Sequence, residues 1–288
     1  MRLVLPGGIV RWAITGAVAF VAAYAITIAL YASTGVGRPE QITDVRPAAD
    51  GTTVTIDVEE LHSVRGALGA NLTVSPGKEL LDPVTHTLKD DLSVAVTSEV
   101  TTKQDWSKGV VPGVLPVPLA IYGDPSEWPF DHYRSEEIVV ELFRGPAQLP
   151  ERVPVTFVDR LPGWTVTVPV GAATDAPYRL DFERSPSTAA FAADMVVAMV
   201  VLAALGLFVA FQTVRDRAKF QPVMIPWYAA MLFAVVPLRN ALPDSPPIGF
   251  WIDITVVLWV IVVLVTSMAL YILCWWRQVR EDAHKPTA

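Results

Sequence analysis

The chain has 288 residues, of which 52% are hydrophobic, and carries a formal net charge of −7 at neutral pH. This apolar fraction exceeds that of an ordinary soluble domain and indicates a membrane protein. The acidic balance argues against nucleic-acid binding, which requires a basic surface. The single cysteine, Cys274, excludes an intrachain disulfide.

The first predicted element is an N-terminal transmembrane signal-anchor, residues 1–33. Its uncharged stretch from Trp12 to Ser33 is long enough to cross a hydrocarbon core of about 30 Å. A cleavable signal peptide usually has a shorter apolar core, so we expect this span to be retained. Cleavage near Ala32 is the alternative.

Residues 34–187 form a polar middle in which apolar and polar residues alternate, as they do in strands. Seven runs show the pattern: TTVTIDVEEL, LGANLTVSP, LSVAVTSEV, EEIVVELF, VPVTFVDR, WTVTVPV and YRLDFER. We therefore predict an extracytoplasmic antiparallel β-sandwich of immunoglobulin-like type. Its 13 Lys and Arg residues against 23 Asp and Glu residues give a net charge of about −10, which keeps the domain soluble or attracts basic partners.

Three further spans are predicted within residues 188–276, at about 188–214, 223–238 and 250–276. The middle one is short and contains Pro226 and Pro237, which packing against neighbouring helices can accommodate. The predicted fold class is therefore an α+β membrane protein, with a β-sandwich and four transmembrane helices. The polar tail, residues 277–288, is expected to be cytoplasmic and disordered.

Basic residues near the span ends set the predicted orientation. With both termini in the cytoplasm, eight of them fall inside: Arg2, Arg11, Arg215, Arg217, Lys219, Arg277, Arg280 and Lys285. The short outer loop, residues 239–249, then holds Arg239 alone. The positive-inside rule thus predicts a multi-pass protein of the cell (inner) membrane with residues 34–187 on the extracytoplasmic side.

No catalytic site, metal site or cofactor is predicted. The sequence has no nucleotide-binding, metalloprotease or hydrolase motif, and its four histidines lack metal-ligand spacing. We therefore expect a protein that is not an enzyme.

A charge cluster is predicted at the outer membrane edge. Asp194, Arg239 and Asp253 fall at the same depth in the assigned topology, and charges at that depth tend to pair or to reach the interface. We predict that Arg239 bridges both aspartates and ties the last three helices together. The alternatives are three separate interfacial charges or an ion relay.

The stretch EWPFDHYR contains a predicted coupling loop formed by Trp128, Pro129, Phe130, Asp131 and Tyr133. Proline fixes φ and extends the residue before it. As a sandwich corner, the loop would fill the end of the sandwich with Phe130, while Asp131 accepts local backbone hydrogen bonds. The alternative is a loop that faces the membrane and couples the outer domain to the helices.

These residues, together with a segment between the last spans, resemble the uncharacterised actinobacterial membrane family of domain of unknown function 4436. The matching residues of that segment are Arg239, Asn240, Pro243, Pro246, Pro247, Ile248, Gly249 and Asp253. The resemblance covers nearly the whole chain and implies a membrane location without an assigned activity.

The Pro-Phe-Asp core is also similar to the signature loop of pentameric ligand-gated channels. The flanking cysteines of that loop are missing here, a span precedes the β-domain, and the third span has no polar stripe to line a pore.

The expected function is docking or scaffolding in the cell envelope through the outer β-domain. The expected partners are the lipid bilayer and either other envelope proteins or a second copy of the chain. The alternative is a channel or transporter-like protein with the β-domain as sensor.

Overall fold

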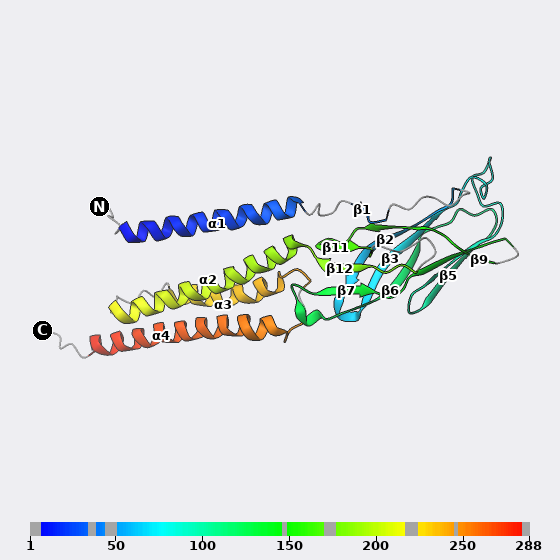
Figure 1. The fold of residues 1–288 in the computed structure, drawn as a ribbon. Helices are drawn as coiled ribbons and strands as arrows, with labels where there is room; N and C mark the ends of the chain where they lie inside the picture. The colour runs from blue at the N-terminus through cyan, green and yellow to red at the C-terminus, as the bar shows by residue number, and fades with distance from the viewer. Residues whose placement is uncertain are drawn as a thin grey trace. The chain divides into compact units, whose positions relative to one another are not determined.

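The computed structural model describes residues 7–33, 39–43, 51–145, 149–169, 177–216, 224–244 and 247–283 (Figure 1). The chain forms two compact units, one of residues 28–188 and one of the residues before and after them. Five residues used in the sequence arguments lie outside the described ranges: Arg2, Arg217, Lys219, Pro246 and Lys285.

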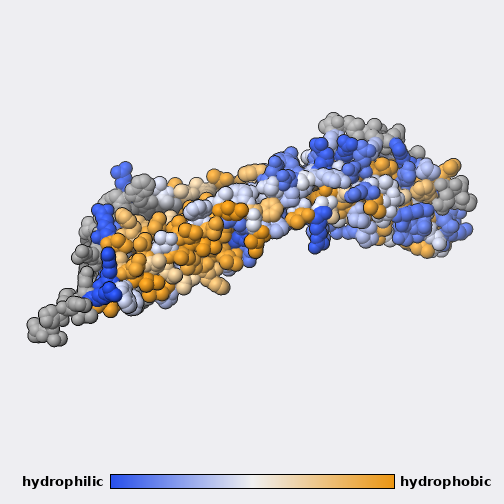
Figure 2. Space-filling view, turned by 90° about the horizontal axis from the view of Figure 1, so that it is seen from below, coloured by the Kyte–Doolittle hydropathy of each residue, from blue (hydrophilic) through white to orange (hydrophobic). Residues whose placement is uncertain are grey.

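The second of these, the helical unit, contains most of α1 (Gly7–Ser33) and α2 (Pro186–Asp216), together with α3 (Met224–Asn240) and α4 (Leu258–Ala283). A π-helical turn, η3 (Asp253–Val257), runs directly into α4. Apolar side chains cover the face of this unit that Figure 2 shows. Such a surface is stable in lipid and costly in water.

Three segments are long and apolar enough to cross a membrane: Ile14–Ser33, Pro186–Arg215 and Asp253–Arg280. The remaining helix, α3, has 17 residues and contains Pro237. At 1.5 Å per residue it is about 25 Å long, shorter than a hydrocarbon core of about 30 Å. The fourth span therefore stays a prediction.

The helices α2, α3 and α4 share an apolar core that includes Met199, Met231 and Leu264. Close packing depends on Gly206, because a Cβ there would lie 3.0 Å from Leu264 Cδ2. The Tyr228 hydroxyl donates a hydrogen bond of 2.7 Å to the Gly206 carbonyl.

The C-terminal tail differs from the prediction. Helix α4 continues to Ala283, so residues 277–283 are helical and not disordered. The helix continues because Arg277, Gln278, Val279 and Arg280 are compatible with helix and no Gly or Pro interrupts them. Residues 284–288 lie outside the described ranges.

Residues 28–188 contain the β-domain, whose strands form an eight-stranded sheet in the order β1-β10-β2-β3-β6-β7-β12-β11 and a four-stranded sheet in the order β5-β4-β8-β9. The strands are β1 (Glu40–Gln41), β2 (Thr53–His62), β3 (Ala67–Ser75), β4 (Leu92–Thr97), β5 (Thr101–Trp106), β6 (Leu115–Gly123), β7 (His132–Ser135), β8 (Val139–Arg144), β9 (Pro150–Arg152), β10 (Val155–Asp159), β11 (Trp164–Thr167) and β12 (Asp181–Arg184). Hydrophilic residues cover most of the face that Figure 2 shows.

Among the strands that the structure describes, the pairing is mostly antiparallel, as predicted, with one exception. Strands β10 and β2 pair in parallel, with Val155 opposite Val54. The parallel pair is possible because the long chain segment between these strands can cross over and return in the same direction.

One hydrophobic core joins the two sheets. In β2 and β3 alternate residues point inward, and the register places Ile56 opposite Leu72. The core also contains Val94 of β4 and Leu142 of β8, which belong to the other sheet. Period-two alternation in β2 and β3 therefore buries one face of these two strands in that core.

The strand directions define two ends of the β-domain. Strand β12 ends at Arg184, and β7 begins beside it, with His132 opposite Glu183. Strand β6 is antiparallel to β7 and therefore runs in the same direction as β12. The end of β3 lies beside the start of β6, where Leu72 pairs with Leu115. The loop after β3, residues 76–91, and the loop before β6, residues 107–114, therefore lie at the end opposite Arg184. We call them the distal loops.

Candidate functional site

The loop between β6 and β7 is fixed by its own backbone. It opens with a short 3-10 helix, η2 (Pro125–Glu127), where Asp124 Oδ1 accepts a hydrogen bond of 2.8 Å from the Ser126 amide. The Phe130 amide then donates to the Glu127 carbonyl at 2.9 Å. These bonds hold the following aromatic residues in set positions.

The sandwich-corner alternative placed Phe130 in the end of the sandwich, and this expectation was wrong. Phe130 is 68% exposed. Trp128, two residues earlier, is the buried aromatic residue, with 2% of its surface exposed.

Asp131 forms a buried ion pair that sequence analysis missed. Its carboxylate accepts two hydrogen bonds from Arg184, at 2.5 Å from Nε and 3.2 Å from Nη2. Both side chains are only 1% exposed. Two parallel charge-assisted bonds form a strong and directional contact, so Asp131 binds the last residue of β12 instead of the local backbone.

Aromatic rings enclose this ion pair. The Arg184 guanidinium lies 4.3 Å from the Trp164 ring centroid, a favourable cation–π distance. Tyr133 packs edge-on against Trp164, with centroids 5.6 Å apart. Burial, and then the negative charge of Asp131, raise the pKa of the Tyr133 hydroxyl, so this phenol stays neutral well into the alkaline range. We call Asp131, Arg184, Trp164 and Tyr133 the exit clamp.

The second pair lies in the helical unit. Arg239 Nε and Nη2 each donate to the Asp253 carboxylate at 2.9 Å, and the two side chains are 10% and 13% exposed. The Gly249 amide donates to the same carboxylate at 2.8 Å. Asp253 opens the π-helical turn, a local distortion often found at functional sites.

The third predicted member of the charge cluster lies elsewhere. Asp194 accepts a hydrogen bond of 2.7 Å from the Thr27 hydroxyl, which connects α2 to α1. Among the described residues Arg239 forms its ion pair with Asp253 and none with Asp194. The structure thus joins two of the three predicted residues and gives the third a different partner.

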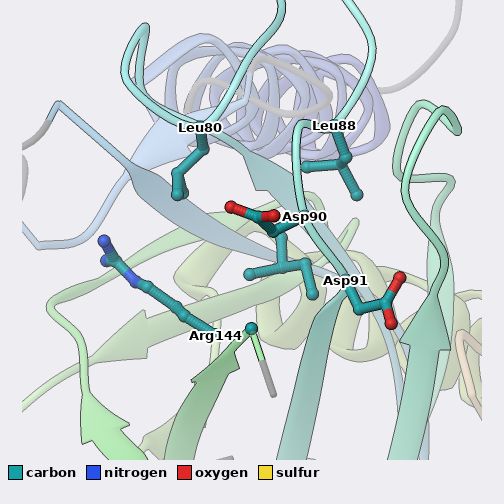
Figure 3. A pocket seen from close by; sticks show the side chains of 7 residues that line it. Leu80, Leu88, Asp90, Asp91 and Arg144 are labelled. Carbon is teal, nitrogen blue, oxygen red and sulfur yellow. The ribbon is translucent and has the colours of Figure 1, made fainter. Parts of the chain in front are cut away.

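A cavity of about 220 Å³ lies between the loop 76–91 and the adjoining ends of β4 and β8, and is lined by Leu80, Leu88, Asp90, Asp91, Leu92, Arg144 and Gly145. Figure 3 shows the Asp90 carboxylate between Leu80 and Leu88, with Asp91 pointing away from them. Small-molecule sites usually measure roughly 300–1,000 Å³, so this cavity suits a single side chain. Within the described ranges, no three His, Cys, Asp or Glu residues come together in a group that could hold a metal ion.

Comparison with protein families divides the chain at the exit clamp. Residues 42–182 match the model described as "Domain of unknown function (DUF4436)". The β-domain is a DUF4436 domain. Residues 184–278 match a second model, "Domain of unknown function (DUF8686)". No curated protein matches the chain.

The two matches are connected by the buried pair. The DUF4436 domain contributes Asp131, whereas Arg184 is the first residue of the second match. The motif from Arg239 to Asp253, assigned to the same family by the resemblance, falls in the second match.

Proposed function

We propose that the protein is a non-enzymatic docking or scaffolding component of the cell envelope. In this proposal four helices cross the membrane, both termini are cytoplasmic, and residues 34–187 form an immunoglobulin-like sandwich outside. The three long apolar helices support it, as does the clustering of basic residues at those span ends that this topology assigns to the cytoplasm.

The observation that carries the proposal is the exit clamp. Strand β12 ends at Arg184 and α2 begins at Pro186, with Ser185 alone between them. The Ser185 amide also donates to the Gly163 carbonyl at 3.0 Å. The buried ion pair therefore fixes the strand from which the chain enters α2, and a single residue separates the two elements.

The distal loops supply a surface for docking. Val84, Val111 and Val114 have more than half of their surface exposed. The loops are connected to each other, because the Leu88 amide donates to Val110 and the Gly109 amide to Leu88. Apolar patches exposed on a protein surface mark interaction sites. We take the three valines to form such a patch, and the adjacent cavity has room for one partner side chain.

Site-specific photocrosslinking in cells tests this proposal. A crosslinker at position 111 is expected to give one discrete adduct, containing either an envelope protein or a second copy of the chain. Val84→Asp should abolish the adduct, and a crosslinker at the exposed Thr165 of β11 serves as control. Equal labelling at both positions, or purification in mild detergent as a lone monomer without adduct, would contradict docking.

The channel alternative remains a prediction, and it differs from the docking proposal in the electrical current that it expects. It requires current across a reconstituted bilayer that is lost on Phe130→Ala or Asp131→Ala. The docking proposal expects no current above that of empty bilayers.

A further inference from the structure

Phe130 is an apolar residue held in the open by a rigid loop. Its neighbours Trp128 and Asp131 are buried at 2% and 1% exposure, whereas Phe130 itself is 68% exposed. Its amide is bonded to Glu127, and Asp131 is held by Arg184. These contacts hold the chain on both sides of Phe130 and leave its ring on the surface.

A second exposed apolar side chain projects from the neighbouring turn. Val64 lies in η1 (Ser63–Arg65), between β2 and β3, and is 58% exposed. This turn lies beside the end of β6, because the Ile121 amide donates to the Gly66 carbonyl at 2.9 Å. Strand β6 leads directly to the loop that holds Phe130, so both side chains belong to the end of the domain where β12 finishes.

Chain connectivity restricts what this end can face. Only Ser185 separates β12 from α2, and one residue spans at most about 3.6 Å. From Pro186 to Arg215 the chain is long and apolar enough to cross a membrane. The end of the β-domain that holds Phe130 and Val64 is therefore the end from which the chain enters α2.

We infer that Phe130 and Val64 insert into the outer headgroup region of the membrane. The inference rests on the proposed membrane anchoring and adds a lipid-contact surface to it. Apolar and aromatic side chains gain free energy at that depth. The charges beside them are mixed, with Glu127 near Phe130 and Arg65 near Val64, so the contact is hydrophobic and does not require anionic lipid or low salt.

Nitroxide scanning tests the inference on the full chain. In a Cys274→Ser background, single cysteines replace Phe130, Val64, Val111 of the distal loops or Leu205 of α2, which is 48% exposed. Each labelled protein is placed in nanodiscs of phosphatidylcholine. Collision with oxygen, which concentrates in lipid, is compared with collision with a water-soluble nickel chelate.

Labels at 130 and 64 are expected to favour oxygen severalfold over the label at 111, and added salt should leave the ratio unchanged. Labels at 130 and 64 that match position 111, while 205 reports lipid, would overturn the inference and leave membrane anchoring intact. Shielding of both labels from both reagents would also overturn it, because protein would then cover them. A label at 205 that reports water would instead contradict the proposed anchoring.

Discussion

The two ion pairs of this molecule differ in how deeply they are buried in the protein and in how far apart their residues lie in the sequence. In the β-domain Asp131 and Arg184 are 1% exposed and 53 residues apart in sequence. In the helical unit Arg239 and Asp253 are 10% and 13% exposed and 14 residues apart. The first pair joins segments from two family matches, and the second lies within one.

This difference shows what each pair does. A fully buried charge is tolerable only with its partner in place, so the first pair couples the exit strand of the β-domain to the loop before β7. The second pair is partly exposed, and its carboxylate also accepts a hydrogen bond from the Gly249 amide. It holds a helix–helix turn and depends less on a single contact.

The largest effect is expected for Asp131→Asn. This change removes the carboxylate charge opposite a buried guanidinium, and breaking a buried pair costs about 3–5 kcal/mol. Urea unfolding of the full chain in detergent, followed by β-sheet circular dichroism, measures the loss. The control is Glu137→Gln, whose exposed pair with Arg179 is worth about 0.2–1 kcal/mol. Equal losses in both variants would remove the distinction.

A smaller effect is expected for Asp253→Asn. The Arg239 guanidinium keeps some solvent contact, so losing one charged partner should cost about 1–3 kcal/mol. The measurement is resistance of the helical unit to unfolding in sodium dodecyl sulfate. A loss as large as that of Asp131→Asn in the β-domain would show that exposure does not separate the two pairs.

Gly206→Leu tests the apolar packing of the helices, which involves no ion pair. The new side chain would press on Leu264 and Tyr228, and overpacking typically costs about 1–3 kcal/mol. Gly16→Leu is the matched control, because nothing lies within 4 Å of a Cβ at that position. The same detergent titration should show a loss for the first variant and little change for the second.

The smallest effect concerns alkaline pH. The pKa of Tyr133 is raised in the folded state by burial and then by Asp131, so the unfolded chain loses this proton first, near the ordinary tyrosine pKa of about 10. Stability from this group is therefore complete below pH 10 and falls as pH rises above it. Tyr133→Phe should flatten the decline of β-domain stability above pH 10. An unchanged slope would contradict the assignment.

The sequence predicted much of the β-domain because its strands alternate. The seven alternating runs overlap β2, β3, β4, β8, β10, β11 and β12. Strand β6 was missed because it contains Pro116 and Pro118, which lie where β6 pairs with β3 alone and a missing amide is tolerated. Strand β5 was missed because Lys103, Gln104 and Asp105 are all exposed, which hides the alternation.

The exit clamp required the fold, although one signal pointed to it. Leu180, Phe182 and Arg184 alternate on one face of the segment that contains β12, and all three are buried. An arginine in phase with core residues demands a buried carboxylate. The register that places β7 beside β12 identifies which one, and a pairing so distant in sequence cannot be derived from local spacing.

A double-mutant cycle tests the central claim most directly. Asp131→Asn, Arg184→Gln and the double variant are compared with the parent chain by urea unfolding in detergent. A clamp formed by these two side chains predicts a coupling energy of about 1–3 kcal/mol, within the range measured for residues in contact. A coupling energy near zero would show that the two residues act independently and would contradict the clamp.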